Sequence, residues 1–219
     1  MKGSCERQVF ERLRLAYGTS GWWPAESGFE VMVGAVLTQN TAWANVERAI
    51  AELRRADLLA PEAIAAVGLG QLASLIRSSG YFNVKAARLK ALVAWIHDSG
   101  GLEALGRMPT EVLRARLLEV KGVGPETADD ILLYAFHRPV FVIDAYTRRL
   151  FSRLGAIRGN EHYEILRRRF EEAFPDDVAR LNEYHALIVR HAKDVCRSRP
   201  LCPGCALKDL CAVGALQPG

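Results

Sequence analysis

Residues 118–128 constrain the fold of this chain more than any other stretch. They read Leu-Glu-Val-Lys-Gly-Val-Gly-Pro-Glu-Thr-Ala, so a Gly-Val-Gly turn separates two apolar segments and Pro125 opens the second. Proline favours the first position of a helix, and glycines let a turn approach a partner closely. The stretch therefore predicts a helix, a tight hairpin at Gly122, Val123 and Gly124, and a second helix.

The segment after Pro125 has the spacing of an amphipathic helix. Its apolar residues share one helix face: Ala128, Ile131, Leu132, Ala135 and Phe136. Backbone N–H groups beside a helix N-terminus attract anions. We therefore expect the hairpin to bind a DNA phosphate, with Lys121 at its front.

Helical periodicity recurs along most of the remaining chain. It predicts helices over residues 5–17, 29–37, 46–53, 61–78, 80–97, 110–118 and 144–154, and a last helix that includes Leu187 and Ile188. No segment alternates apolar and polar residues over strand length, so the fold class is all-α.

Length and charge set only broad limits. The 219 residues, 50% of them hydrophobic, supply ample core for one or two small domains, and the net charge of +4 favours nucleic acid only weakly. The apolar run at residues 31–37 is far shorter than the ~20 residues of a membrane span. With no signal peptide before the first helix, we expect a cytoplasmic, nucleoid-associated monomer without a membrane partner.

Four of the five cysteines lie close together near the C-terminus. Their spacing is Cys-x5-Cys-x2-Cys-x5-Cys, at Cys196, Cys202, Cys205 and Cys211. In a reducing compartment such a group favours metal ligation over disulfides. Four thiolates can hold zinc or a [4Fe–4S] cluster, and spacing alone does not separate the two. Cys5 stands apart and is expected to be a free thiol.

Aromatic and amide side chains before residue 45 suggest a binding pocket. Trp22 and Trp23 are adjacent in an expected loop, and each has a large apolar face and an indole N–H. They can pack onto the core or form a stacking wall for a flat ligand. Gln39 and Asn40 follow a buried helix as capping groups or ligand contacts, and Trp43 adds another aromatic face.

A helix, the Gly-Val-Gly hairpin and a second helix are followed by Val-Ile-Asp at 142–144 and a basic helix. This order of features resembles the helix-hairpin-helix DNA glycosylase superfamily, which includes endonuclease III. The resemblance covers residues 18–211. It implies a two-domain fold in which residues 28–137 form a six-helix domain that carries the hairpin. Residues 1–27 with 138–219 would form a second helical domain that bears the four-cysteine loop. The implied partner is double-stranded DNA with a damaged base.

The resemblance implies that Asp144 is the catalytic residue. Cleavage of an N-glycosidic bond develops positive charge on the sugar, which a carboxylate stabilises; the alternative role for Asp144 is a helix N-cap. In bifunctional members a lysine at the position of Glu126 forms a Schiff base, and glutamate cannot. The implied enzyme is a DNA N-glycosylase, a hydrolase without lyase activity.

Four motifs resemble the 3-methyladenine DNA glycosylase III branch in particular: Trp-Trp-Pro, Leu-Thr-Gln-Asn-Thr, Gly-Tyr-Phe-Asn-x-Lys-Ala and Gly-x-Glu-Thr-Ala-Asp. In that branch aromatic side chains enclose an alkylated purine, and a cationic base gains ~0.5–2 kcal/mol from cation–π attraction. The implied pocket residues are Trp22, Trp23, Pro24, Gln39, Asn40, Trp43 and Glu126. Glu126 also suits a helix N-terminus without any ligand.

The resemblance also implies which residues contact DNA. Tyr81 would wedge into the duplex and recover part of the few kcal/mol that base extrusion costs, although ordinary packing is the alternative. The other implied contacts are Lys85, Lys121, Gly122, Val123, Gly124 and Arg148.

Endonuclease III-like proteins hold [4Fe–4S] with the spacing Cys-x6-Cys-x2-Cys-x5-Cys, so this chain is one residue short in the first gap. The matching later gaps favour iron–sulfur over zinc. The folded loop would present Arg197, Arg199 and Lys208 to the phosphate backbone. Two alternatives stay open: a glycosylase for oxidised pyrimidines or mismatched bases, and a non-catalytic iron–sulfur DNA-binding protein.

Overall fold

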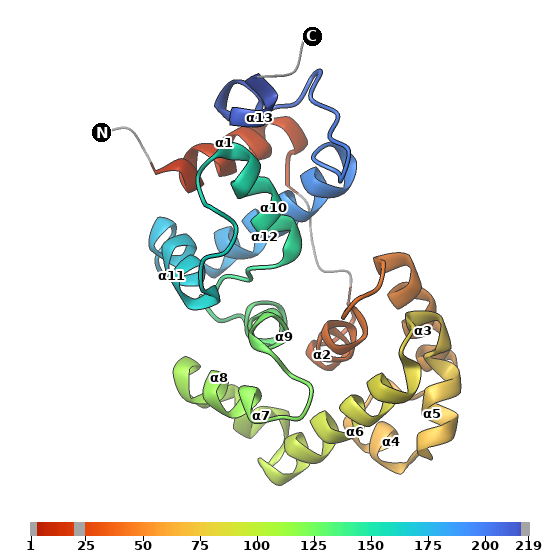
Figure 1. Cartoon of the computed structure of the whole chain (residues 1–219). Helices are drawn as coiled ribbons and strands as arrows, with labels where there is room; N and C mark the ends of the chain where they lie inside the picture. Colours follow the sequence, from red (N-terminus) through yellow and green to blue (C-terminus); the bar gives the residue numbers. More distant parts are fainter. Residues whose placement is uncertain (1–3, 20–24, 216–219) are drawn as a thin grey trace. The chain divides into compact units, whose positions relative to one another are not determined.

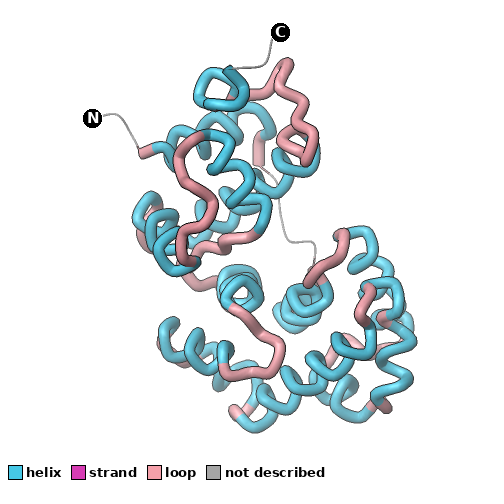
Figure 2. Tube along the Cα trace, viewed as in Figure 1, coloured by secondary structure: helices cyan, strands magenta, loops and turns pink. Residues whose placement is uncertain are grey.

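The structure, a computed structural model, describes residues 4–19 and 25–215, and every regular element in these ranges is a helix (Figures 1 and 2). The all-α prediction is therefore confirmed. The chain divides into two compact units, one of Ala25–Arg138 and the other of Met1–Pro24 with Pro139–Gly219. None of the described helices is long and apolar enough to cross a membrane.

The Ala25–Arg138 unit is built around one buried helix. Its elements are α2 (Gly28–Leu37), α3 (Trp43–Arg55), α4 (Pro61–Ala66), α5 (Leu69–Leu75), η1 (Arg77–Ser79), α6 (Phe82–Asp98), α7 (Gly101–Gly106), α8 (Thr110–Leu118), α9 (Pro125–Asp130) and the π-helical η2 (Ile131–Ala135). α2 packs against α3, α6, α9 and η2, and its residues 29–37 are all buried, as its apolar sequence predicts. Its one charged residue, Glu30, pairs with Arg54 at 2.7 Å.

The helix that follows the hairpin departs from regular α geometry. It begins at Pro125 as predicted, but widens into a π turn over Ile131–Ala135. A π turn is rare and occurs often at functional sites. The 3.6-residue spacing of the sequence does not predict it.

The other unit packs around α12. Its described elements are α1 (Cys5–Tyr17), α10 (Ala145–Leu154), α11 (Tyr163–Ala173), α12 (Val178–Asp194), η3 (Lys208–Leu210) and α13 (Ala212–Ala215). α12 packs against α1 and α10. The core is largely aromatic: Phe141 stacks on Phe170 at 4.6 Å, and Tyr184 lies 5.5 Å from Phe141 and 5.5 Å from Phe10.

A buried segment leads directly into α10. Residues 140–143 are at most 2% exposed. Side chains accept hydrogen bonds from two of its backbone N–H groups. The Phe141 N–H donates to Glu171 Oε1 at 2.9 Å, and the Ile143 N–H donates to Tyr163 Oη at 3.3 Å. These contacts fix the backbone on which Asp144 stands.

Candidate active site

The hairpin at residues 120–124 is anchored by two valines. Val120 and Val123 are each 6% exposed, and the Val123 N–H donates to the Val120 carbonyl at 3.0 Å. Lys121 and Gly124 are exposed. The turn therefore keeps its apolar side chains inside and its basic side chain in solvent.

Gly122 needs to be glycine for two reasons. Its φ of +90° is in the left-handed region, which side chains disfavour. A Cβ there would also lie 2.4 Å from Arg88 Cγ. The hairpin therefore lies so close to Arg88 on α6 that no side chain fits at position 122.

A buried ion pair joins the two helices that flank the hairpin. Arg114 on α8 donates to both carboxylate oxygens of Asp129 on α9, at 2.7 and 3.0 Å, and the two side chains are 8% and 0% exposed. No motif in the sequence predicts this role for Arg114. The one hint is that Asp129, a charged residue, lies next to the apolar residues of the helix after the hairpin.

Three of the predicted pocket residues have defined positions after α2. Gln39 donates its amide to the Gly122 carbonyl at 3.0 Å and to Thr127 Oγ1 at 2.9 Å, so it holds the hairpin. Asn40 is exposed with a φ of 53°. Trp43 was predicted between helices, which is wrong: it begins α3, and its indole N–H donates to Glu47 at 2.8 Å.

Four further residues belong to the predicted pocket: Trp22, Trp23, Pro24 and Glu126. Trp22, Trp23 and Pro24 lie outside the described residues, so their roles stay predictions. Glu126 is exposed in the first turn of α9, where negative charge is favoured.

Tyr81 has an unusual backbone and an exposed ring. Its φ is 46° and its side chain is 71% exposed, and it follows Gly80 with a φ of 69°. A left-handed conformation at a bulky residue costs free energy and persists only where the surroundings hold it. This geometry suits a wedge, which stays a prediction.

The prediction that Lys85 contacts DNA phosphate is wrong for this structure. Lys85 is 1% exposed, and its Nζ donates to the carbonyls of Leu37 at 2.8 Å and Ser79 at 2.6 Å. Desolvation and the nearby charge of Arg88 lower the pKa of Lys85 to about 8. The residue therefore belongs to the interior of its unit.

Asp144 is a buried helix cap with a histidine neighbour. Its Oδ1 accepts the Thr147 N–H at 2.7 Å, and its Oδ2 lies 3.6 Å from His185 Nε2. Burial raises the pKa of Asp144, but the hydrogen bonds and charge of His185 and the Thr147 N–H outweigh it, so the pKa lies below its ordinary value. The 9% exposed carboxyl is therefore ionised at neutral pH.

His185 lies on α12 without any recognisable motif, so the sequence did not predict its place beside Asp144. Arg148, predicted to bind DNA, donates to the Glu161 carbonyl at 3.0 Å. It therefore stabilises the loop after α10, and its DNA contact stays a prediction.

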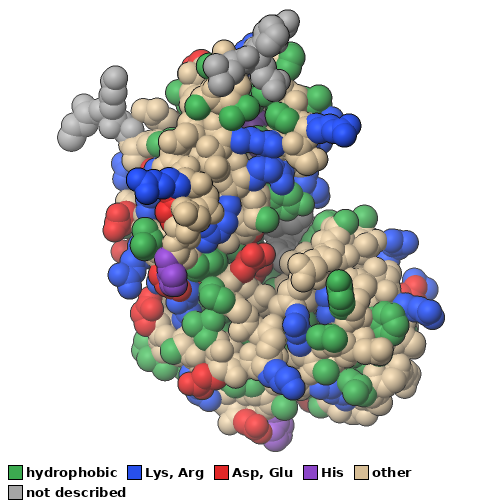
Figure 3. Space-filling model, in the orientation of Figure 1, with side chains coloured by type: hydrophobic (Ala, Val, Ile, Leu, Met, Phe, Trp, Pro, Cys, Tyr) green, Lys and Arg blue, Asp and Glu red, His purple; other side chains and the backbone are tan. Residues whose placement is uncertain are grey.

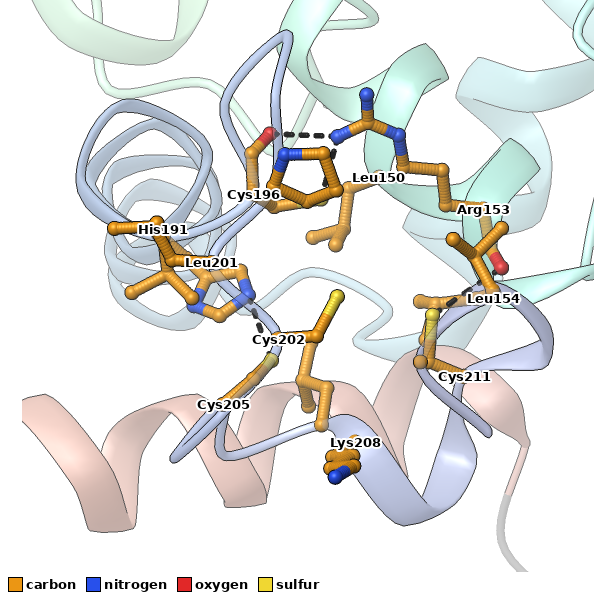
Figure 4. A pocket seen from close by; sticks show the side chains of 15 residues that line it. Leu150, Arg153, Leu154, His191, Cys196, Leu201, Cys202, Cys205, Lys208 and Cys211 are labelled. Carbon is orange, nitrogen blue, oxygen red and sulfur yellow. Dashed lines mark hydrogen bonds between the residues drawn. The ribbon is translucent and has the colours of Figure 1, made fainter. Parts of the chain in front are cut away.

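The four clustered cysteines are free thiols that line one pocket, with Leu150, Leu154 and Leu201 among the other lining residues (Figure 4). Within residues 4–19 and 25–215, no three His, Cys, Asp or Glu side chains are placed to hold a single metal ion. Four thiols around one pocket are a donor set that suits zinc as well as a [4Fe–4S] cluster, so the identity of the bound group stays a prediction.

Polar groups surround the cysteine pocket. Arg153 donates to Cys196 Sγ at 3.3 Å, and Arg149 donates to the Cys196 carbonyl at 2.9 Å. His191 is fully buried, with Nε2 3.6 Å from Cys205 Sγ and Nδ1 2.7 Å from Tyr17 Oη. Desolvation lowers the pKa of His191 to about 4, so the ring is neutral.

One unit thus carries a hairpin suited to a phosphate, and the other carries a buried carboxylate that is ionised at neutral pH. The hairpin and the carboxylate are the features on which the resemblance to DNA glycosylases rests. The chain belongs to the HhH-GPD superfamily of base excision DNA repair proteins, whose family model matches residues 33–176. It is therefore a DNA glycosylase of the helix-hairpin-helix kind.

Individual relatives match nearly the whole chain. A Methanocaldococcus jannaschii protein, named provisionally as a DNA repair glycosylase, is 47% identical over 207 residues, which are 93% of this chain and 94% of the relative. The Helicobacter pylori 3-methyladenine DNA glycosylase bound to 1,N6-ethenoadenine has a TM-score of 0.74 and 30% identity, covering 86% of this chain and 97% of that one. An endonuclease III–DNA complex matches in fold, with a TM-score of 0.81, 24% identity, and coverage of 95% and 94%.

Proposed function

We propose that the protein is a monofunctional glycosylase that hydrolyses the N-glycosidic bond of an alkylated purine of the 3-methyladenine type, extruded from duplex DNA. The observation that carries the proposal is the Asp144 carboxylate, buried, ionised and fixed by the Thr147 N–H. The similarity to the H. pylori 3-methyladenine glycosylase supports the choice of base.

Asp144 acts by stabilising charge. As the glycosidic bond breaks, positive charge develops on the sugar, and a desolvated carboxylate beside C1′ stabilises it more strongly than water does. The N-cap bond holds Oδ1, so the carboxylate does not have to reorient during the reaction. Alkylated purines are already good leaving groups, and the reaction needs little acid catalysis.

The absence of lyase activity follows from position 126. The residue at the superfamily's Schiff-base position is Glu126, which has no amine to attack the sugar. Lys121 lies in the exposed part of the hairpin, five positions earlier in the sequence. The product is therefore an abasic site in an unbroken strand.

We also propose that Cys196, Cys202, Cys205 and Cys211 hold a [4Fe–4S] cluster. When bound, the cluster would cross-link the loop of residues 196–211, which Arg149 and Arg153 already tie to α10. Figure 3 shows lysine and arginine side chains spread over the visible face rather than gathered in one patch. The loop is therefore expected to add local phosphate contacts rather than to create a strongly basic surface.

An endonuclease III-like glycosylase for oxidised pyrimidines is the second candidate. The observation that favours it is the presence of four cysteines around one pocket, together with the endonuclease III fold. The released base separates the two candidates, because alkylated purines and oxidised pyrimidines are distinguished by chromatography.

The test is base release from methylated duplex DNA under single-turnover conditions. Asp144→Asn is expected to slow release by about 10²–10³-fold, because it removes the charge that stabilises the sugar cation. Binding to a duplex with an abasic-site analogue should persist. Asp177→Asn is the matched control, since Asp177 caps α12 by accepting the Arg180 N–H at 2.9 Å. Base release by Asp144→Asn at the wild-type rate would mean that Asp144 serves only as a helix cap.

A further inference from the structure

Four exposed non-glycine residues of the Ala25–Arg138 unit have left-handed backbones, and Asn40 and Tyr81 are two of them. Asn40 has a φ of 53° and Tyr81 a φ of 46°, and Tyr81 is 71% exposed. Asparagine tolerates this region, but a bulky tyrosine at such an angle is strained. The surrounding structure must therefore hold the segments that carry them.

A buried ammonium ion connects the two segments. Lys85 Nζ donates to the carbonyl of Leu37, the last residue of α2, and to the carbonyl of Ser79, the last residue of η1. These carbonyls lie three residues before Asn40 and two before Tyr81 in the sequence. A desolvated cation requires such acceptors, and helix C-termini provide favourable negative charge. Lys85 therefore fixes the distance between the two segments.

The connection continues to the hairpin through the next turn of α6. Arg88 lies three residues after Lys85, so the two share one face of α6. Its guanidinium donates to Gln39 Oε1, while Gln39 Nε2 donates to the Gly122 carbonyl at 3.0 Å. The Arg88 stem also fills the space above Gly122, where a Cβ would lie 2.4 Å from Cγ.

We propose that Lys85, Arg88 and Gln39 form a positioning clamp that holds Asn40, Tyr81 and the 120–124 hairpin in one preformed arrangement for engaging DNA. Preorganisation of this kind lowers the entropic cost of binding. The clamp lets the protein grip the backbone and disturb base stacking in a single geometry. It rests on the family's DNA substrate and holds whichever damaged base is excised.

The clamp differs from a set of phosphate contacts. Lys85 is 1% exposed, and its charge is directed at protein carbonyls. Removing the Lys85 ammonium should therefore change how the DNA is distorted. It should leave the number of counterions released on binding unchanged. The salt dependence of binding reports the second quantity separately.

The test uses a duplex that carries an abasic-site analogue beside 2-aminopurine, whose fluorescence rises on unstacking. Lys85→Met keeps the side-chain length and removes the ammonium. It should lower the fluorescence rise and weaken binding on the order of 10-fold, with an unchanged salt slope. The control is Lys90→Met on the same helix, because Lys90 donates to the Ala65 carbonyl, away from both segments. It should behave as the wild type.

A folded Lys85→Met that unstacks the duplex as the wild type does would overturn the proposal. If Lys85→Met does not fold, Arg88→Met decides, since Arg88 is only half-buried. The clamp predicts a lower fluorescence rise with an unchanged salt slope. A slope reduced by about one with normal unstacking would identify Arg88 as a phosphate contact and contradict the clamp.

Discussion

The buried pair of Arg114 and Asp129 gives the sharpest stability prediction. Both side chains are at most 8% exposed, so solvent screens the bidentate contact of 2.7 and 3.0 Å very little. Arg114→Met leaves a buried carboxylate without its guanidinium, which costs about 3–5 kcal/mol. That is a large share of a typical free energy of unfolding of ~5–15 kcal/mol.

Urea unfolding followed by far-UV circular dichroism measures the loss. With a slope of ~2–3 kcal/mol/M for a chain of this size, the midpoint of Arg114→Met should fall by roughly 1–2.5 M. The control is Arg107→Met, whose partner Glu103 forms a pair with side chains 77% and 83% exposed, and which should cost ~0–1 kcal/mol. Adding Asp129→Leu to Arg114→Met should recover most of the loss. Equal midpoints for the two single variants would refute the reasoning.

Three further predictions concern the site. Because the pKa of Asp144 lies below the ordinary 3.8, its carboxylate should still support base release as the pH falls toward that value. The rate of base release and the stability that the carboxylate contributes should be lost only at lower pH. A single-turnover pH profile in which the rate falls well above pH 4 would contradict this. Gly122→Ala should weaken binding to abasic duplex about 10-fold, since 1 Å misplacements are costly, while Gly68→Ala, with open space at its Cβ, should bind normally. Tyr17→Phe removes the hydroxyl at His191 Nδ1, so the proposed cluster should lose iron to a chelator faster than in the wild type, as followed by visible absorption.

Local signals in the sequence predicted much of the fold. The Gly-Val-Gly-Pro run predicted the hairpin and the start of α9, and the apolar run predicted buried α2. The sequence offered an N-cap role for Asp144 because a capping residue and its partner, here Thr147, lie three residues apart. Signals of this kind depend on φ preferences, capping and periodicity within one or two helical turns.

The sequence did not predict contacts between residues that lie far apart along the chain. Lys85 lies in a run of basic residues, but it is buried, and one of its two carbonyl partners is Leu37, 48 residues away in the sequence. Gln39 was predicted to be a capping group or a ligand contact, and the sequence did not predict its amide contacts with residues 83 and 88 positions along the chain. His185 approaches Asp144 from α12. Periodicity identifies the face of a helix but not what packs against it.

The most direct test of the central claim is incubation of the protein with methylated genomic DNA, followed by chromatography of the freed bases and a gel of the strands with and without alkali. The similarity to the H. pylori glycosylase predicts free 3-methyladenine, and the glutamate at position 126 predicts strands that break only after alkali and no covalent adduct on borohydride treatment. A borohydride-trapped protein–DNA adduct would contradict the account. So would release of oxidised pyrimidines from a parallel sample of oxidised DNA without any release of 3-methyladenine from the methylated DNA.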